Sequence, residues 1–265
     1  MRATQDQKGA DFRALHEGEP FIAPNPWDAG SARVLEALGF KALATTSSAF
    51  AYTLGRLDGD ASLDEVLAHV RLLAAATSLP VSVDLENGHG PDPADAASAI
   101  AGAAEAGAVG GSIEDFDPDG GVIYDLEHAV ARVAAAAEAA HGMSFPFTLT
   151  ARAENLIRGN PDLGDTIARL QAYERAGAGV LYAPGLSSTE QIAEVCAAIS
   201  KPVNVLALGN LTRDEIFGAG AQRISVGGGL AWVGVGAIAA AAEEMRDAGS
   251  FAPLASRVPI KDWLG

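Results

Sequence analysis

Carboxylates gather where two neighbouring predicted strands end. Asp84 and Glu86 lie at the end of the apolar run 80–85, and Glu114 ends the run 109–114. Residues two apart on a strand point to the same side, so we expect Asp84 and Glu86 to face the same way, beside Glu114. Acids this close cannot all stay ionised without a cation, and carboxylates with water suit Mg²⁺, with Mn²⁺ as the alternative. We predict a metal site from these three residues. The alternative is that they cap helices or pair with arginine.

Hydroxyls and one arginine follow the adjacent predicted strands. Thr45, Thr46 and Ser47 come after the second strand, Arg152 ends the fifth, and Asn204 lies within the seventh. A guanidinium group is a planar donor fork that binds anions, so Arg152 is a candidate clamp. Metal, arginine and hydroxyls together favour a small chelating anion such as a 2-oxo acid. Two structural alternatives stay open: the hydroxyls satisfy backbone groups, and Arg152 pairs with Glu154.

The predicted strand ends lack lysine and cysteine side chains, which argues against several classes of reaction. None of the four lysines lies at a strand end, which argues against Schiff-base chemistry. Cys196 lies on an apolar helical stripe and is interpreted as structural. His89 and Asp117 are the loop residues available as a general base, although both also suit glycine-rich turns.

The elements that must position these residues alternate along the chain. Eight short apolar runs are predicted strands, at 21–24, 41–46, 80–85, 109–114, 147–152, 179–183, 202–207 and 222–227. Alanine-rich helical segments separate them, at 30–38, 62–77, 93–106, 126–141, 162–176, 188–199, 212–219 and 230–247. Eight such units predict an α/β protein, a (β/α)₈ TIM barrel, with a doubly wound sheet as the alternative. We predict one barrel domain over residues 1–247 and a C-terminal arm over 248–265 that docks onto a partner subunit.

The composition of the chain argues against several classes of binding partner. The 265 residues carry one cysteine, and Lys+Arg 18 against Asp+Glu 34 gives a net charge of −16. Such a charge disfavours nucleic acids and anionic membranes, and one cysteine excludes a disulfide framework. No run approaches the ~20 apolar residues of a membrane span. With no secretory signal visible at the N-terminus, we expect a cytoplasmic protein.

Six motifs in order resemble the isocitrate lyase/phosphoenolpyruvate mutase superfamily. They are PNPWDAGSA at 24–32, ATTS at 44–47, GRLDG at 55–59, VDLENGHG at 83–90, SIED at 112–115 and TARAE at 150–154. The resemblance implies a (β/α)₈ barrel whose eighth helix is exchanged between subunits of a homodimer or homotetramer. It also implies a 2-oxo acid or enolate substrate.

The resemblance further implies roles for single residues. Asp84 would hold Mg²⁺ directly, while Asp58, Glu86 and Glu114 would hold it through water. The substrate carboxylate would meet the backbone amides of Thr46 and Ser47, and Arg152 would meet its oxygens. Arg152, Asp58 and Glu114 are therefore the expected catalytic residues.

The loop after the fourth predicted strand departs from the family lyases. Residues 116–124 contain neither the lysines nor the cysteine of the lyase loop. The chain thus resembles a divergent branch without that loop. A carbon–carbon lyase acting like an oxaloacetate decarboxylase is our first hypothesis. A C–C or P–C bond hydrolase is the second, and a non-catalytic 2-oxo acid-binding protein is the third.

Overall fold

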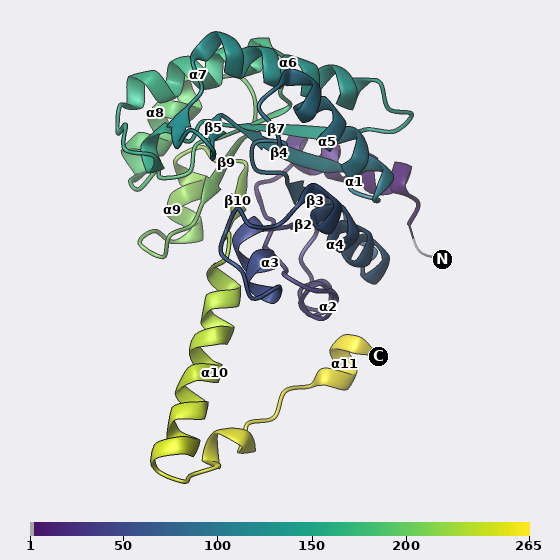
Figure 1. Ribbon diagram of the computed structural model, residues 1–265, viewed down its shortest axis with the longest axis vertical. Coiled ribbons are helices and arrows are strands. Elements are labelled where there is room, and N and C mark those ends of the chain that lie inside the picture. The colour runs from purple at the N-terminus through teal and green to yellow at the C-terminus, as the bar shows by residue number, and fades with distance from the viewer. Residues whose placement is uncertain (1–2) are drawn as a thin grey trace.

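The computed structural model describes residues 3–265 and contains one curled sheet of eight parallel strands (Figure 1). These are β1 (Phe21–Ile22), β2 (Leu43–Ala44), β3 (Val81–Asp84), β4 (Gly110–Glu114), β7 (Thr148–Arg152), β8 (Val180–Tyr182), β9 (Val203–Leu206) and β10 (Arg223–Ser225). They pair in the order β1-β10-β9-β8-β7-β4-β3-β2. The Ala44 N–H donates to the Pro24 carbonyl at 3.1 Å, which links the two edge strands. Strands that neighbour in chain order are typical of a (β/α)₈ barrel, not of a doubly wound sheet.

Helices follow the strands as the alternation predicts (Figure 1). They are α2 (Ala29–Ala37), α4 (Leu63–Ala76), α5 (Pro93–Glu105), α6 (Leu126–His141), α7 (Leu163–Arg175), α8 (Thr189–Ala198), α9 (Arg213–Gly218) and α10 (Gly229–Asp247). Ser62 and Thr212 form capping boxes with the glutamates three residues later. Small side chains let α5 and α6 pack closely, since Ala96, Ala99 and Ala136 are fully buried.

The sequence pattern did not predict several elements, of which α1 has 13 residues and the others are short. They are α1 (Gln5–Glu17), α3 (Ser47–Thr53), the hairpin β5 (Phe116–Asp117) and β6 (Val122–Ile123), η1 (Asn155–Ile157), η2 (Ala252–Ala255) and α11 (Ile260–Leu264). The hairpin matters for function because it forms part of the 116–124 loop. Its turn is tied by the Asp119 N–H, which donates to Asp117 Oδ1 at 3.1 Å, as expected for turn residues.

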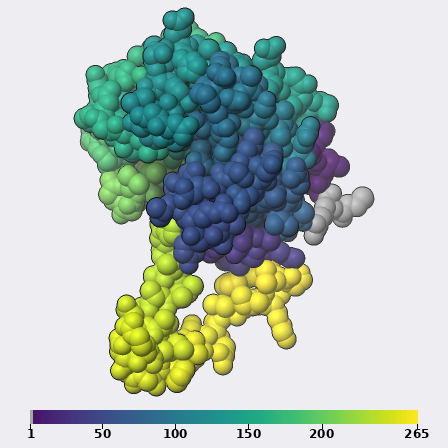
Figure 2. All heavy atoms as spheres, viewed as in Figure 1, coloured from purple at the N-terminus to yellow at the C-terminus, as the bar shows by residue number. Residues whose placement is uncertain are grey.

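The last long helix, α10, stands away from the barrel instead of packing on the sheet (Figures 1 and 2). Ala231 is the one buried residue of this helix, and Val233 and Ile238 are largely exposed. The chain then returns so that α11 contacts α2, where Arg33 donates to the Gly265 carbonyl at 3.1 Å. Within residues 3–265, no helix combines the length and apolarity needed to cross a membrane.

Candidate active site

A pocket of about 210 Å³ opens at the carboxyl ends of the strands, where barrel enzymes place their active sites. The structure brings most of the predicted site residues to its walls: Thr45, Thr46, Ser47, Asp58, Asp84, Arg152 and Asn204. Glu86 and Glu114 do not line this pocket, but both interact with residues that do. The barrel interior beneath is polar, with Ser82, Asn204 and Ser225 buried.

Arg152 is the centre of the site. Its Nη1 lies 2.7 Å from Asp84 Oδ1, and its Nη2 lies 2.8 Å from both Glu114 Oε2 and Glu154 Oε1. Although burial opposes its charge, these carboxylates raise the pKa of Arg152 well above its usual value. The ion pair with Glu154 that we considered from sequence is therefore present, together with two more. Arginine supplies part of the positive charge that the acidic cluster requires.

Asp84 is held as an ionised carboxylate at the end of β3. Its oxygens accept from the Ser47 N–H and the Glu86 N–H, each at 3.2 Å, in addition to the Arg152 pair. Burial raises its pKa, but Arg152 and these backbone donors outweigh that effect and hold the pKa below its usual value. The Asp84 N–H donates to Thr45 Oγ1 at 2.9 Å, so one predicted hydroxyl does satisfy the backbone.

Glu86 was expected to lie on the same strand as Asp84, but it lies in the turn that follows the strand. β3 ends at Asp84, and Glu86 adopts a left-handed backbone with φ of 51°, so strand alternation does not orient it. A Cβ added at Gly59 would lie 3.9 Å from Glu86 Oε2, which places this carboxyl against the segment that carries Asp58. Burial, followed by the charges of Asp84 and Asp58, raises the pKa of Glu86 to about 8. Burial also raises the pKa of Asp58.

Glu114 is buried beneath Arg152 at the end of β4. Burial raises its pKa well above the usual value, even though Arg152 lies at 2.8 Å and Arg158 Nη2 at 3.7 Å. Burial therefore outweighs both guanidinium groups in the direction of this shift. The adjacent Asp115 supports the site from below, since it accepts from the Glu154 N–H at 2.8 Å and the Tyr173 hydroxyl at 2.5 Å.

The carboxylates fit a cation held mainly by one ligand. Across residues 3–265, no three His, Cys, Asp or Glu side chains converge as a ready-made ligand set. Arg152 lies between Asp84 and Glu114, which keeps these two from closing on one ion. Asp58 and Glu86, however, form no ion pair within the described part of the chain, and burial together with the charge of Asp84 raises the pKa of both. This donor set suits a hard divalent ion bound by Asp84, with water between the ion and the other acids.

The opposite wall is assembled from several strands. Asn25 donates to the Thr45 carbonyl at 2.8 Å and accepts from the Val226 and Gly227 N–H groups at 2.8 and 3.0 Å. Asn204 donates to Ser225 Oγ at 3.0 Å and accepts from Arg223 Nε at 2.8 Å.

Sequence reasoning assigned no role to several residues that the structure places at this site. They are Ser112, Arg158, Tyr182 and Arg223. Arg158 is the one with a sequence signal, because it follows Glu154 by four residues and pairs with it at 3.5 Å.

The two loop candidates for a general base differ. His89 has a buried Nε2 without a hydrogen-bond partner, and burial lowers the pKa of its ring. Asp117 lies in the hairpin turn, where its side chain accepts from Asp119.

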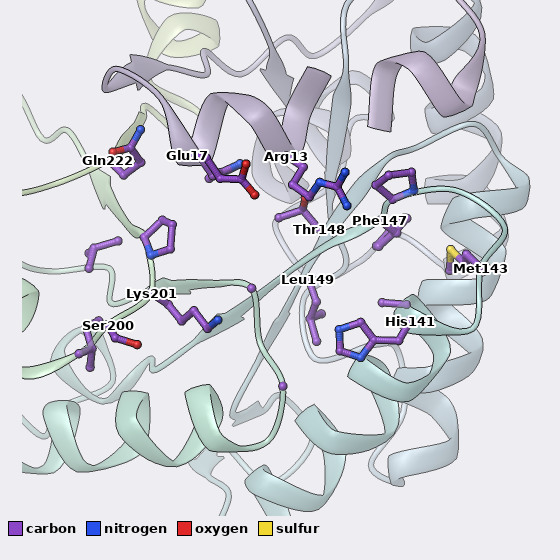
Figure 3. Close-up of a pocket in the computed structure, with 18 of the residues that line it drawn as sticks. Arg13, Glu17, His141, Met143, Phe147, Thr148, Leu149, Ser200, Lys201 and Gln222 are labelled. Atoms are coloured by element: carbon purple, nitrogen blue, oxygen red, sulfur yellow. The ribbon is translucent and has the colours of Figure 1, made fainter. Parts of the chain in front are cut away.

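A larger hollow of about 910 Å³ lies at the opposite end of the barrel (Figure 3). Arg13, His141 and Lys201 surround it, and Lys201 comes just before β9, as its place at a strand start predicts. It contains none of the clustered carboxylates, so its size does not make it the reaction site.

Comparison with known proteins shows the family of this chain. A family model described as phosphoenolpyruvate phosphomutase matches residues 12–246. The chain belongs to this family. It is thus a member of the PEP mutase/isocitrate lyase superfamily, which contains carbon–carbon lyases and hydrolases.

Relatives of this superfamily member have diverse names. A crystal structure from Burkholderia cenocepacia J2315, described as a "putative lyase/mutase", shares 50% identity with a TM-score of 0.94, covering 98% of this chain and 95% of that one. The uncharacterised protein Rv1998c of Mycobacterium tuberculosis is 32% identical over 88% of this chain and 87% of its own. An oxaloacetate decarboxylase of Bradyrhizobium diazoefficiens is 31% identical over 72% and 68%. A solved phosphonopyruvate hydrolase complex with oxalate and Mg²⁺ is 22% identical, covering 97% of this chain and 92% of that one, and its TM-score of 0.85 shows likeness of fold.

Proposed function

We propose that this protein is a Mg²⁺-dependent enzyme that breaks a carbon–carbon bond next to the pyruvyl unit of a 2-oxo acid, as an oxaloacetate decarboxylase does. The observation that carries the proposal is the Asp84 carboxylate, which lines a small pocket together with Asp58 and lies near Glu86, two acids that form no ion pair within the described residues. The Bradyrhizobium relative supports the reaction type. When bound, Mg²⁺ would stabilise the negative charge of an enolate as it forms.

The chain's own residues take distinct roles in this proposal. Asp84 would hold the metal directly, and Asp58, Glu86 and Glu114 would hold it through water. The backbone amides near Thr46 and Ser47 receive the substrate carboxylate, Arg152 orients the substrate oxygens, and Asn204 contributes to binding from the far wall. Burial raises the pKa of Glu114, which lies 2.8 Å from Arg152.

The composition of the 116–124 segment supports one lyase subtype over the others. It contains no lysine or cysteine, so we place the chain in a branch without the lyase cysteine loop. Loss of CO₂ from an oxaloacetate-like acid needs no such residue, because the enolate can be protonated by water. A C–C or P–C hydrolase is the second candidate, and the unpartnered His89 Nε2 favours it as a base. A binding protein without catalysis is the third.

We further propose that residues 1–247 form the catalytic barrel and that residues 248–265 form an arm. The exposed apolar side chains of α10 and the arm, including Val233, Ile238 and Phe251, suit exchange of α10 between two or four subunits. Light scattering should therefore give a dimer or tetramer, and Ile238→Glu should shift it towards monomer.

Thermal denaturation with Mg²⁺, with oxalate and with both tests the site, since oxalate mimics the enolate of pyruvate. A ligand at 100 times its Kd adds about 2.7 kcal/mol to stability. We expect the two ligands to stabilise the wild type synergistically, Asp84→Ala to lose the effect, and the exposed control Asp214→Ala to keep it. Absence of synergy in the wild type would overturn the metal–enolate site. Product analysis by NMR with 2-oxo acids then separates the lyase, hydrolase and binding proposals.

A further inference from the structure

The loop at 86–92 has an unusual backbone. Glu86 and His89 adopt left-handed conformations, with φ of 51° and 59°, although neither is glycine. This conformation is unfavourable for residues other than glycine and persists only where the surroundings fix it. The loop is also seated closely on α5, because a Cβ at Gly88 would lie 2.9 Å from Ala96 Cα. Some interaction must therefore hold this loop in place.

Arg132 of α6 makes that interaction. Its guanidinium donates to four loop carbonyls, those of Asn87, Gly90, Pro91 and Asp92. The distance is 2.8 Å to Gly90 and 3.2 Å to Asp92. The guanidinium lies 4.7 Å from the Tyr124 ring centre, and the Tyr124 hydroxyl accepts from Asn87 Nδ2 at 3.3 Å. Arginine and tyrosine together enclose the loop.

Arg132 differs from Arg152 and Arg169, which form ion pairs with carboxylates. Its side chain is 1% exposed, yet it forms no ion pair within residues 3–265. Burying a charge without a counter-ion is costly unless it is hydrogen-bonded. Here neutral backbone carbonyls accept from Nη1 and Nη2, whereas the buried Nε has no hydrogen-bond partner within the described residues.

We propose that Arg132 is a positioning residue that fixes the 86–92 loop and thereby keeps the Glu86 carboxyl beside Asp84. The inference rests on the proposed metal site, whose donors it orients. Arg132 belongs to the helix that follows β4, whereas the loop follows β3. Arg132 thus connects the strand–helix segment that contains Glu114 with the strand and loop that contain Asp84 and Glu86. Groups that orient metal donors typically change metal affinity by 10–100-fold when removed.

The test uses Arg132→Lys, which keeps the charge and loses the planar fork, and Arg175→Lys, an exposed control on α7. Mg²⁺ binding is titrated calorimetrically on the full chain without substrate, and hydrogen exchange is followed across 86–92. We expect the Mg²⁺ Kd to rise about 10–100-fold and loop amides to exchange faster in Arg132→Lys, with neither change in the control. If the lysine variant fails to fold, Arg132→Gln, which buries no charge, gives the same measurement.

The outcomes separate the two proposals. A folded Arg132 variant that binds Mg²⁺ with the wild-type Kd refutes the positioning role, even if its melting temperature falls, because a merely structural residue would behave this way. A wild type that binds no Mg²⁺ refutes the proposed metal site itself, and with it the consequence for affinity.

Discussion

Replacing Arg152 by methionine tests whether one guanidinium balances the acidic cluster. The change keeps an apolar stem but leaves Asp84, Glu114 and Glu154, now within 2.8 Å of Arg152, without their shared cation. Removing one partner of a buried ion pair costs about 3–5 kcal/mol. We expect a loss of that size in the free energy of unfolding at pH 8, measured by urea denaturation without metal. The exposed Arg175→Met serves as the control.

The loss of stability in Arg152→Met should depend on pH, and this dependence identifies the cause of the loss. Burial already raises the pKa of Glu114 above its usual value, and loss of Arg152 raises it further. A carboxyl whose folded-state pKa is raised binds a proton in the folded protein first, so stability increases as pH falls. The difference in free energy of unfolding between Arg152→Met and the wild type should therefore become smaller as the pH falls from 8 to 5. We expect a decrease of about 1.4 kcal/mol per pH unit for each additional proton that the folded variant binds.

A constant difference across this pH range would refute the reasoning. It would mean that Arg152→Met destabilises the protein through lost packing and not through uncompensated charge. Added Mg²⁺ provides a second test, because a divalent cation should increase the stability of Arg152→Met more than that of the wild type.

Three further changes should have defined effects. Tyr173→Phe removes a hydroxyl that donates to the buried Asp115 carboxylate, and we expect urea denaturation to show a loss of about 1.5–3 kcal/mol; a loss under 0.5 kcal/mol would contradict this. Burial and Arg223 lower the pKa of His16 to about 3, so wild-type stability should fall by about 1.4 kcal/mol per unit as pH drops below 6.5, and His16→Asn should lose this component; parallel pH curves would argue against it. Gly88→Ala combines a φ of 87° with a contact of 2.9 Å to Ala96 Cα, so its melting temperature and Mg²⁺ affinity should both fall, whereas Gly218→Ala, with open space around it, is the control.

Much of the fold could be predicted because its signals are local. Apolar runs bounded by turn residues located all eight barrel strands, and alanine-rich segments located the helices between them. Asp84, Glu114 and Arg152 were predicted as site residues because strand ends of a parallel barrel meet at one edge. Short elements were missed, since α3 and the β5–β6 hairpin are too brief to show a period.

The sequence by itself determined the order of the elements and the chemical types at the strand ends, because both follow from periodicity and residue identity. Tertiary structure alone decided how charges pair. Arg152 approaches Asp84 and Glu114 only because β3, β4 and β7 are neighbours in the sheet, and Arg132 reaches the 86–92 loop from a helix more than forty residues away in sequence, as the Asn87 contact shows. Glu86 likewise faces the site through a left-handed turn that strand alternation could not indicate. Burial, which sets the pKa values of Glu86 and Glu114, exists only once the chain has closed around them.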